Sequence, residues 1–240
     1  MDRHEVEKAK WDSKTSKFSE DNEKPTLDSY DEVFLSMNTL RPIHTFFALE
    51  GKTVSILDLG CGAGWTTLLL TQKAKDVHAI DISFNSIKRL NHYKNKYSLP
   101  NISAIVGDGE LLPYPDNYFD YVFGNASLHH LILEKVVSET SRVLKKDGKA
   151  AFCEPFAHNP IMNFYRFVKH NFLEEFHGTD KPLTYSDKNI FSRHFSKVSF
   201  VECSFFSDNI PALRSFESAI LNRFPFTRRF ASYITILATK

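Results

Sequence analysis

Short apolar runs alternate with amphipathic stretches through most of the chain. The apolar runs predict strands near residues 54–59, 77–81, 102–106, 119–124, 149–154, 198–206 and 233–239, and the amphipathic stretches predict helices near 65–75, 83–97 and 131–144. Strands that alternate with helices of about 10–15 residues are typical of βαβ units. The pattern therefore predicts an α/β fold in which a doubly wound, mostly parallel sheet carries helices on both faces.

Two regions depart from this alternation. Residues 1–27 are polar apart from Trp11 and Phe18, which leaves open a disordered segment or one that folds over a ligand; a helical pattern with Pro42 inside it follows over 28–50. Residues 155–196 are rich in aromatic side chains and predict a mostly helical lid insertion, and 212–224 predicts a helix. We expect a helical cap segment over 1–50 and a main domain over 51–240, with the insertion at about 155–196.

The bulk composition indicates a soluble, cytoplasmic protein. Thirty basic and 29 acidic residues give a formal charge of +1, which disfavours a nucleic-acid partner. The three cysteines are widely spaced, which fits a reducing compartment, and the charged N-terminus does not resemble a signal peptide. No apolar run approaches the roughly 18 residues of a membrane span.

A glycine-rich loop follows the first strand, with Asp58 at its start and glycines at 60, 62 and 64. Glycines allow close approach of a ligand, and a helix N-terminus beside the strand ends offers free N–H groups. A dinucleotide-binding loop has its third glycine where Trp65 stands here, and tryptophan would obstruct close packing. The acidic Asp58 favours a cationic ligand such as S-adenosylmethionine.

A second marker is Asp81, which ends the second predicted strand. A carboxylate at this place can accept hydrogen bonds from both hydroxyls of a ribose, in dinucleotides and in S-adenosylmethionine alike. A surface aspartate that caps the following helix is the alternative interpretation.

Five stretches in order resemble the motifs of class I S-adenosylmethionine-dependent methyltransferases, in the branch of ubiquinone and menaquinone biosynthesis and small-molecule methyltransferases. They cover residues 56–64, 79–83, 107–113, 119–120 and 144–148. The resemblance implies a Rossmann-like methyltransferase fold with seven strands and an antiparallel last strand. It implies S-adenosylmethionine as cofactor and a small-molecule acceptor, whose reacting atom (oxygen, nitrogen or carbon) stays open.

The resemblance also implies roles for individual residues. The methionine part of the cofactor would be held by Asp58, Gly60, Cys61 and Gly62, and by the backbone of Asn125; the ribose by Asp81; and the adenine by Ile82, Asp108 and Gly109. The family closes this pocket with its N-terminal segment, so Trp11 or Tyr30 is expected over the cofactor.

Methyl transfer requires positioning and exclusion of water, and some acceptors also need a base. His129 or His130 is the candidate base, with Glu154 as the alternative, although the sequence favours a structural role of the histidines over a catalytic one. His158, Asn159, Tyr165 and Arg166 are candidate substrate contacts, and Arg166 could equally be a solvated helix residue. The residues after the fourth strand lack a carboxylate cluster, so we predict no metal.

Three alternatives remain open: an acceptor in RNA or protein, a non-catalytic S-adenosylmethionine-binding protein and, disfavoured by Trp65, an NAD-dependent oxidoreductase. Residues 223–229 mix arginine with phenylalanine, which suits a lipid surface, nucleic acid or an ordinary helix end. The sequence leaves the oligomeric state open.

Overall fold

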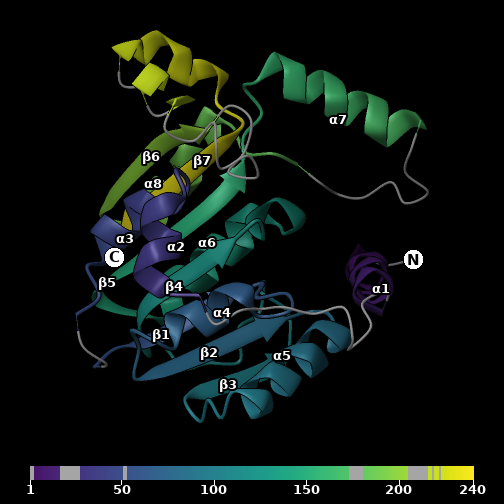
Figure 1. Ribbon diagram of the computed structural model, residues 1–240, viewed down its shortest axis with the longest axis vertical. Coiled ribbons are helices and arrows are strands. Elements are labelled where there is room, and N and C mark those ends of the chain that lie inside the picture. Colours follow the sequence, from purple (N-terminus) through teal and green to yellow (C-terminus); the bar gives the residue numbers. More distant parts are fainter. Residues whose placement is uncertain are drawn as a thin grey trace.

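A seven-stranded sheet forms the centre of the molecule (Figure 1). The computed structural model describes residues 3–16, 28–50, 53–172, 181–204, 216–217, 219–221 and 223–240. The strand order is β3-β2-β1-β4-β5-β7-β6, and β7 is the strand that runs antiparallel to both of its neighbours. This arrangement confirms the predicted fold class. The strands are β1 (Ser55–Leu59), β2 (Asp76–Asp81), β3 (Ile102–Val106), β4 (Phe119–Asn125), β5 (Leu144–Pro155), β6 (Lys197–Ser204) and β7 (Tyr233–Thr239).

Helices cover both faces of the sheet. Alternate residues of β1 face opposite sides: Ile56 joins the buried cluster under α2, α3 and α4, whereas Leu57 joins the cluster under α6 and α8. The helices are α1 (Arg3–Ser16), α2 (Tyr30–Ser36), α3 (Arg41–Phe47), α4 (Trp65–Leu70), α5 (Phe84–Lys96), α6 (Leu133–Val143), α7 (Pro160–Phe172) and α8 (Lys188–His194), with short 3₁₀ turns η2 (Leu128–His130), η3 (Tyr185–Asp187) and η4 (Pro225–Phe230).

The N-terminal region is helical in its described parts. Residues 3–16 form α1, which packs on α5. The helix lies beyond the edge of the sheet, at the right of Figure 1. The predicted helical stretch over 28–50 is divided into α2 and α3, and Pro42 lies in the first turn of α3, where its missing N–H costs nothing. The insertion contains α7, η3 and α8. Of the helix predicted over 212–224, residues 216–217, 219–221 and 223 are helical, whereas 212–215, 218 and 222 fall outside the described residues.

Strand β5 begins five residues earlier than its hydrophobic run. Leu144 pairs with Phe119, and the register then shifts before Tyr121 pairs with Lys149. Asp147 has a φ of 61° within this stretch, so the bend at Asp147 is accommodated as an irregularity of the strand. A polar stretch therefore extends β5 beyond the hydrophobic run that predicted the strand.

The carboxyl ends of β1, β2, β4 and β5 meet at one edge of the sheet. Because these strands are parallel, the segments that leave Leu59, Asp81, Asn125 and Pro155 emerge side by side. Such an edge, between strands whose connections turn to opposite faces, is where open α/β sheets bind ligands.

Candidate functional site

The glycine-rich loop after β1 has the conformation that only glycine adopts readily. Gly60, Gly62 and Gly64 have φ values of 69°, 51° and 89°. A Cβ atom on Gly64 would lie 2.3 Å from Cδ1 of Leu90, and one on Gly60 would lie 2.5 Å from Cβ of Ser127. A Cβ on Gly62 would meet no atom within 4 Å. Two of the glycines therefore permit close packing, and Gly62 lies beside open space.

This open space is a cavity of about 300 Å³, which we call the cofactor cavity. It holds two carboxylates, and no lysine or arginine is among its described lining residues, so it suits a ligand with hydroxyl and amino groups better than one with phosphates. Its lining comprises Trp11, Leu59, Gly60, Cys61, Gly62, Ala63, Trp65, Thr66, Ile80, Asp81, Ile82, Ser86, Gly107, Asp108, Gly109, Asn125, Ala126, Ser127, His130 and Leu131.

The two carboxylates of the cavity are fixed by backbone N–H groups. Asp81 accepts from the N–H of Gly62 at 2.8 Å through Oδ2 and from that of Ser83 at 2.9 Å through Oδ1. Burial raises the pKa of Asp81, and these two hydrogen bonds oppose the rise. Asp108 accepts from the N–H of Glu110 at 2.8 Å. Each carboxylate is thus held in place while it borders the cavity.

Asp58 lies beneath the loop and outside the lining of the cofactor cavity. Its Oδ2 accepts from the hydroxyls of Thr66 at 2.9 Å and Thr67 at 2.6 Å, whereas Oδ1 has no hydrogen-bond partner among the described residues. Burial raises the pKa of Asp58 to about 6. The neighbouring Cys61 lines the cavity as a neutral thiol, because burial and the two nearby aspartates raise its pKa.

Helix α1 forms one wall of the cofactor cavity. Trp11 lines the cavity, and its ring makes an edge contact with His130 at a centroid distance of 5.2 Å. Asp12 accepts from the hydroxyl of Ser83 at 2.5 Å and the N–H of Asn85 at 3.1 Å, at the start of α5. Tyr30, the other residue expected over the cofactor, instead lies in the core, stacked on Phe34.

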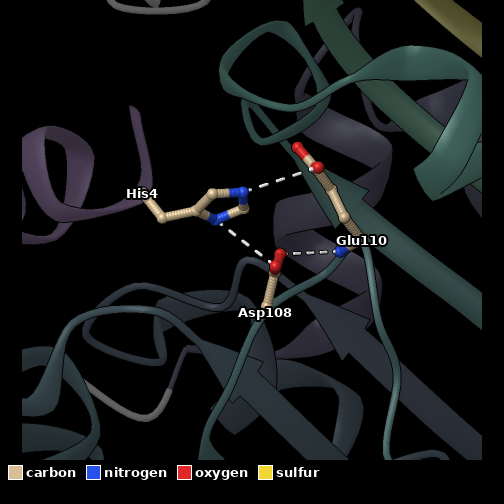
Figure 2. A group of neighbouring side chains, drawn as sticks. All are labelled: His4, Asp108 and Glu110. Atoms are coloured by element: carbon tan, nitrogen blue, oxygen red, sulfur yellow. Dashed lines mark hydrogen bonds and ion pairs between the residues drawn. The ribbon is translucent and has the colours of Figure 1, made fainter. Parts of the chain in front are cut away.

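A cluster of charged side chains joins α1 to the loop after β3 (Figure 2). His4 Nδ1 lies 3.3 Å from Asp108 Oδ2, and its Nε2 lies 3.7 Å from Glu110 Oε2. Their ligand-type atoms lie within 4.8 Å of one another, as in a metal site. Arg3, however, pairs with Glu110, and Lys135 Nζ lies 3.6 Å from the same carboxylate. With these cations in place, the cluster acts as an ion-pair contact between α1 and the cavity wall.

The partly buried His129 and the fully buried Glu154 form a pair close to the cofactor cavity. His129 Nδ1 lies 2.7 Å from Glu154 Oε2. Glu154 is fully buried, and it also accepts from the backbone N–H groups of Ser127, Leu128 and His129 at 2.9, 2.8 and 3.4 Å. All of these donors belong to the turn that carries the two histidines. The contacts favour an orienting role for Glu154 over the role of base.

The two histidine rings lie against each other, with centroids 3.9 Å apart. His130 lines the cofactor cavity and also a second cavity of about 460 Å³, which His129 lines as well. The described lining of this second cavity comprises Arg3, Leu128, His129, His130, Leu131, Ile132, Leu133, Lys181, Pro182, Leu183, Thr184 and Asp187. The histidine pair therefore separates a space suited to the cofactor from a space open to another molecule.

The candidate substrate residues lie outside the lining of both cavities. Asn159 is buried and caps α7: its Oδ1 accepts from the N–H groups of Ile161 and Met162 at 3.0 and 3.1 Å. Arg166 donates to the carbonyl of Phe156 at 3.1 Å, and burial lowers its pKa. His158 is exposed and packs on the rings of Phe156 and Tyr185, and the side chain of Tyr165 is outside the described part.

Several residues of this site were absent from the sequence prediction. Arg3, His4, Glu7 and Asp12 meet partners that lie about 70 to 130 residues further along the chain, and no local pattern marks them. Ser127 is the second residue after β4, and its buried hydroxyl has no hydrogen-bond partner in the described part of the chain at the cofactor cavity. Its place after a strand end was the available signal.

The sequence of this chain is similar to those of known methyltransferases. The family described as "Methyltransferase domain" matches residues 57–152. The chain is 31% identical over 200 residues to the malonyl-[acyl-carrier protein] O-methyltransferase of Buchnera aphidicola, covering 82% of this chain and 71% of that protein. It is 29% identical over 116 residues to the demethylmenaquinone methyltransferase of Thermobifida fusca, covering 47% of this chain and 48% of that protein.

Among solved structures, phosphoethanolamine N-methyltransferase 2 of Haemonchus contortus, in complex with S-adenosyl-L-methionine, has the same fold. The TM-score is 0.63 at 18% identity, over 88% of this chain and 56% of that one. The matches span about half the length of several curated relatives. The ordered motifs, the sheet topology and the 200-residue match together place this chain in the class I S-adenosylmethionine-dependent methyltransferase family.

Proposed function

We propose that this protein transfers the methyl group of S-adenosylmethionine to a small-molecule acceptor. The observation that carries the proposal is the cofactor cavity, whose described lining combines a glycine-rich turn and two carboxylates without any lysine or arginine. S-adenosylmethionine is cationic at its sulfonium and amino groups, whereas the pyrophosphate of NAD would require compensation of negative charge in this cavity.

The lining residues fit the parts of the cofactor in turn. Asp81, whose two oxygens each retain acceptor capacity, would take the ribose hydroxyls, and Asp108 would accept from the adenine amino group. Gly60, Cys61, Gly62, Asn125 and the unpartnered hydroxyl of Ser127 would border the methionine part. Trp11 of α1 would cover the cavity and exclude water.

Asp58 would act from beneath the loop. Its unpartnered Oδ1 is a buried acceptor, and a cationic ligand above the loop favours the ionised form of this carboxylate. We therefore propose an electrostatic contribution of Asp58 to cofactor affinity rather than a contact in the cavity lining.

Bound S-adenosylmethionine supplies an electrophilic methyl group, and the protein supplies position and, where the acceptor needs it, a base. We propose that His129 is this base. Because Glu154 would accept a hydrogen bond from Nδ1–H of His129, Nε2 of His129 is left to take a proton from an acceptor in the second cavity. His130 would shape the passage between the two cavities.

The acceptor is proposed to be small, because the second cavity holds about 460 Å³ and the sequence-related demethylmenaquinone enzyme is named for a small molecule. The malonyl-[acyl-carrier protein] enzyme is named for a carrier-protein-bound acceptor, which defines the competing candidate. Lys181 and Arg3 border the second cavity and would favour an acidic group on the acceptor.

Calorimetric titration with S-adenosylhomocysteine and with NAD tests the cofactor. We expect binding of the first, and binding of NAD alone would overturn the proposal. Asp81→Asn should lower the affinity for S-adenosylhomocysteine at least about tenfold, since the substitution replaces a charged hydrogen-bond acceptor by a neutral amide. The exposed Asp116→Asn is the matched control.

A labelling experiment tests the acceptor class. Cell extract is incubated with the enzyme and S-adenosylmethionine labelled in its methyl group, and is then separated into small molecules, RNA and protein. Enzyme-dependent label in the small-molecule fraction is the expected result. Label confined to RNA, or to protein other than carrier protein, would overturn a small-molecule acceptor, and label on a carrier protein would establish the competing candidate.

A further inference from the structure

The exposed phenylalanines of this protein gather in two segments. Apart from Phe84, those of the described residues lie in α7 or in residues 216–230, namely Phe164, Phe167, Phe216, Phe224, Phe226 and Phe230. Phe164 and Phe226 are 68% and 61% exposed. Single exposed hydrophobic residues are common in soluble proteins, whereas a group of large aromatic ones marks an interaction surface.

The two segments lie at the same end of the molecule (Figure 1). Asn159, which caps α7, donates to the hydroxyl of Ser232 at 2.9 Å, and Ser232 follows η4 by two residues. The N–H of Phe156 donates to the carbonyl of Ser232 at 2.7 Å. These bonds bring the start of α7 and the end of η4 together, where β5 ends and β7 begins. This is the sheet edge that carries the cofactor cavity.

The phenylalanines named above lie outside the buried core, whereas Leu221 between them is buried. Residues Ile161, Phe164 and Phe167 are three apart on α7, so they lie along one side of the helix, and all are exposed. No residue of η4 is buried. More than half of each of these three α7 side chains is exposed, so this part of their hydrophobic surface is available to a partner.

Positive charge accompanies the phenylalanines of the η4 segment. Arg223 and Arg229 are exposed, and no carboxylate of the described residues pairs with either of them. Arg229 donates to the carbonyl of Phe226 at 3.1 Å, and its guanidinium lies 5.4 Å from the ring centroid of Phe230. Arginine beside exposed aromatic rings matches the chemistry of an anionic lipid surface, whose interface accepts rings and whose headgroups attract cations.

We propose that the exposed side of α7 and residues 223–230 form a docking surface for an anionic lipid bilayer. The phenylalanines enter the interface between headgroups and acyl chains, and Arg223 and Arg229 contact the anionic headgroups. The protein would bind the membrane peripherally, because no helix of the described residues has the length and hydropathy of a membrane span. The carboxyl edge of the sheet would then face the lipid.

The balance of chemistry favours lipid over single-stranded RNA, the other partner that mixed arginine and phenylalanine can bind. Affinity for nucleic acid rests mainly on cations that meet phosphates. Here the exposed apolar side chains outnumber the unpaired arginines, and the α7 face that carries Ile161, Phe164 and Phe167 is hydrophobic rather than basic.

Cosedimentation with vesicles tests the proposal. We expect the protein to bind phosphatidylcholine vesicles that contain phosphatidylglycerol. Binding to vesicles of pure phosphatidylcholine should be weaker by at least about fivefold for each arginine that contacts an anionic headgroup. Phe226→Ser combined with Phe230→Ser should lower the partition coefficient at least about tenfold per phenylalanine inserted. Arg229→Gln should reduce the preference for anionic vesicles.

Phe84→Ser is the matched control, because Phe84 is 59% exposed on α5, away from this surface. Unchanged thermal unfolding and S-adenosylhomocysteine binding show that each variant is folded, so failure of the docking proposal is distinguishable from failure of the proposed function. The proposal is overturned if the wild-type protein does not bind anionic vesicles, or if the double variant binds them as well as the wild-type protein does. It is also overturned if the double substitution abolishes self-association or RNA binding and leaves vesicle binding unchanged.

Discussion

The contact between Glu154 and the histidine turn predicts a specific effect of Glu154→Gln. The carboxylate is fully buried and accepts from three backbone N–H groups and one histidine ring. Glutamine has nearly the same shape, but one of its terminal atoms is an NH₂ group that cannot accept. Whichever way the amide is oriented, two of the four donors therefore face another donor.

The magnitude follows from the number of lost acceptors. A buried donor without a partner costs about 1–3 kcal/mol, so two of them reduce the free energy of unfolding by about 2–6 kcal/mol. For a protein of this size, the midpoint of thermal unfolding shifts by about 2–4 °C for each kcal/mol, which gives a decrease of about 4–24 °C. Asp116→Asn, the same chemical change at an exposed ion pair with Arg142, should cost at most about 1 kcal/mol.

A second readout separates orientation of His129 from stability alone. In the wild-type protein the carboxylate holds the proton on Nδ1 of His129, and NMR correlation of the ring nitrogens with the ring protons reports this tautomer. Glu154→Gln should change the ring-nitrogen shifts, because the amide can present either a donor or a weaker acceptor to Nδ1. A variant with the same unfolding midpoint as Asp116→Asn and an unchanged His129 tautomer would refute the reasoning.

Four further substitutions test the loop and its cover. Gly64→Ala should lower the free energy of unfolding by more than about 2 kcal/mol, because the φ of Gly64 is 89° and the new Cβ would lie 2.3 Å from Leu90. Gly62→Ala should lower the free energy of urea unfolding by less, but it should weaken the binding of S-adenosylhomocysteine measured by calorimetry. Asp58→Asn should raise the free energy of unfolding at pH 7 by roughly 1–3 kcal/mol, because burial raises the carboxyl pKa to about 6. The wild-type protein should gain this stability as pH falls from about 6 to about 4, because Asp58 takes up its proton at a higher pH in the native state than in the unfolded state. Urea unfolding at several pH values should show no such gain in the variant. Trp11→Ala should weaken S-adenosylhomocysteine binding and speed amide exchange in α1 without a matching loss of global stability, measured by calorimetry and hydrogen exchange.

The strands were predictable from the sequence because they are short apolar runs that end in polar or glycine-rich turns. β3 and β7 match their predicted bounds, since the pattern of these runs is local. β5 was predicted too short, because Lys145 to Gly148 are polar, and only pairing of Leu144 with Phe119 on β4 makes this stretch part of the sheet. Bounds that depend on a partner strand are not encoded in the hydrophobic pattern of one segment.

The site was predictable where function follows from position at a strand end. Asp81, Asp108 and Asn125 border the cofactor cavity because parallel strands bring their carboxyl ends together. The family resemblance suggested Trp11 for the cover of the pocket, but the contacts of His4 with the loop after β3 and of α1 with α5 were not predictable from any local pattern. Asp58 was expected at the cofactor, but its threonine partners on α4 hold it below the loop.

The turn after β4 explains why a carboxylate is needed at the end of β5. The chain reverses at Ala126, whose φ of 53° is unfavourable for a residue with a side chain, and then forms the short turn η2. Such a turn leaves several N–H groups unpaired, and a buried position denies them water. Glu154 accepts from three of them and from the His129 ring at once, so a single side chain of β5 stabilises the reversal and orients the proposed base. The strained backbone at Ala126 and the hydrogen bonds accepted by Glu154 therefore act together to place the histidines at the boundary of the two cavities.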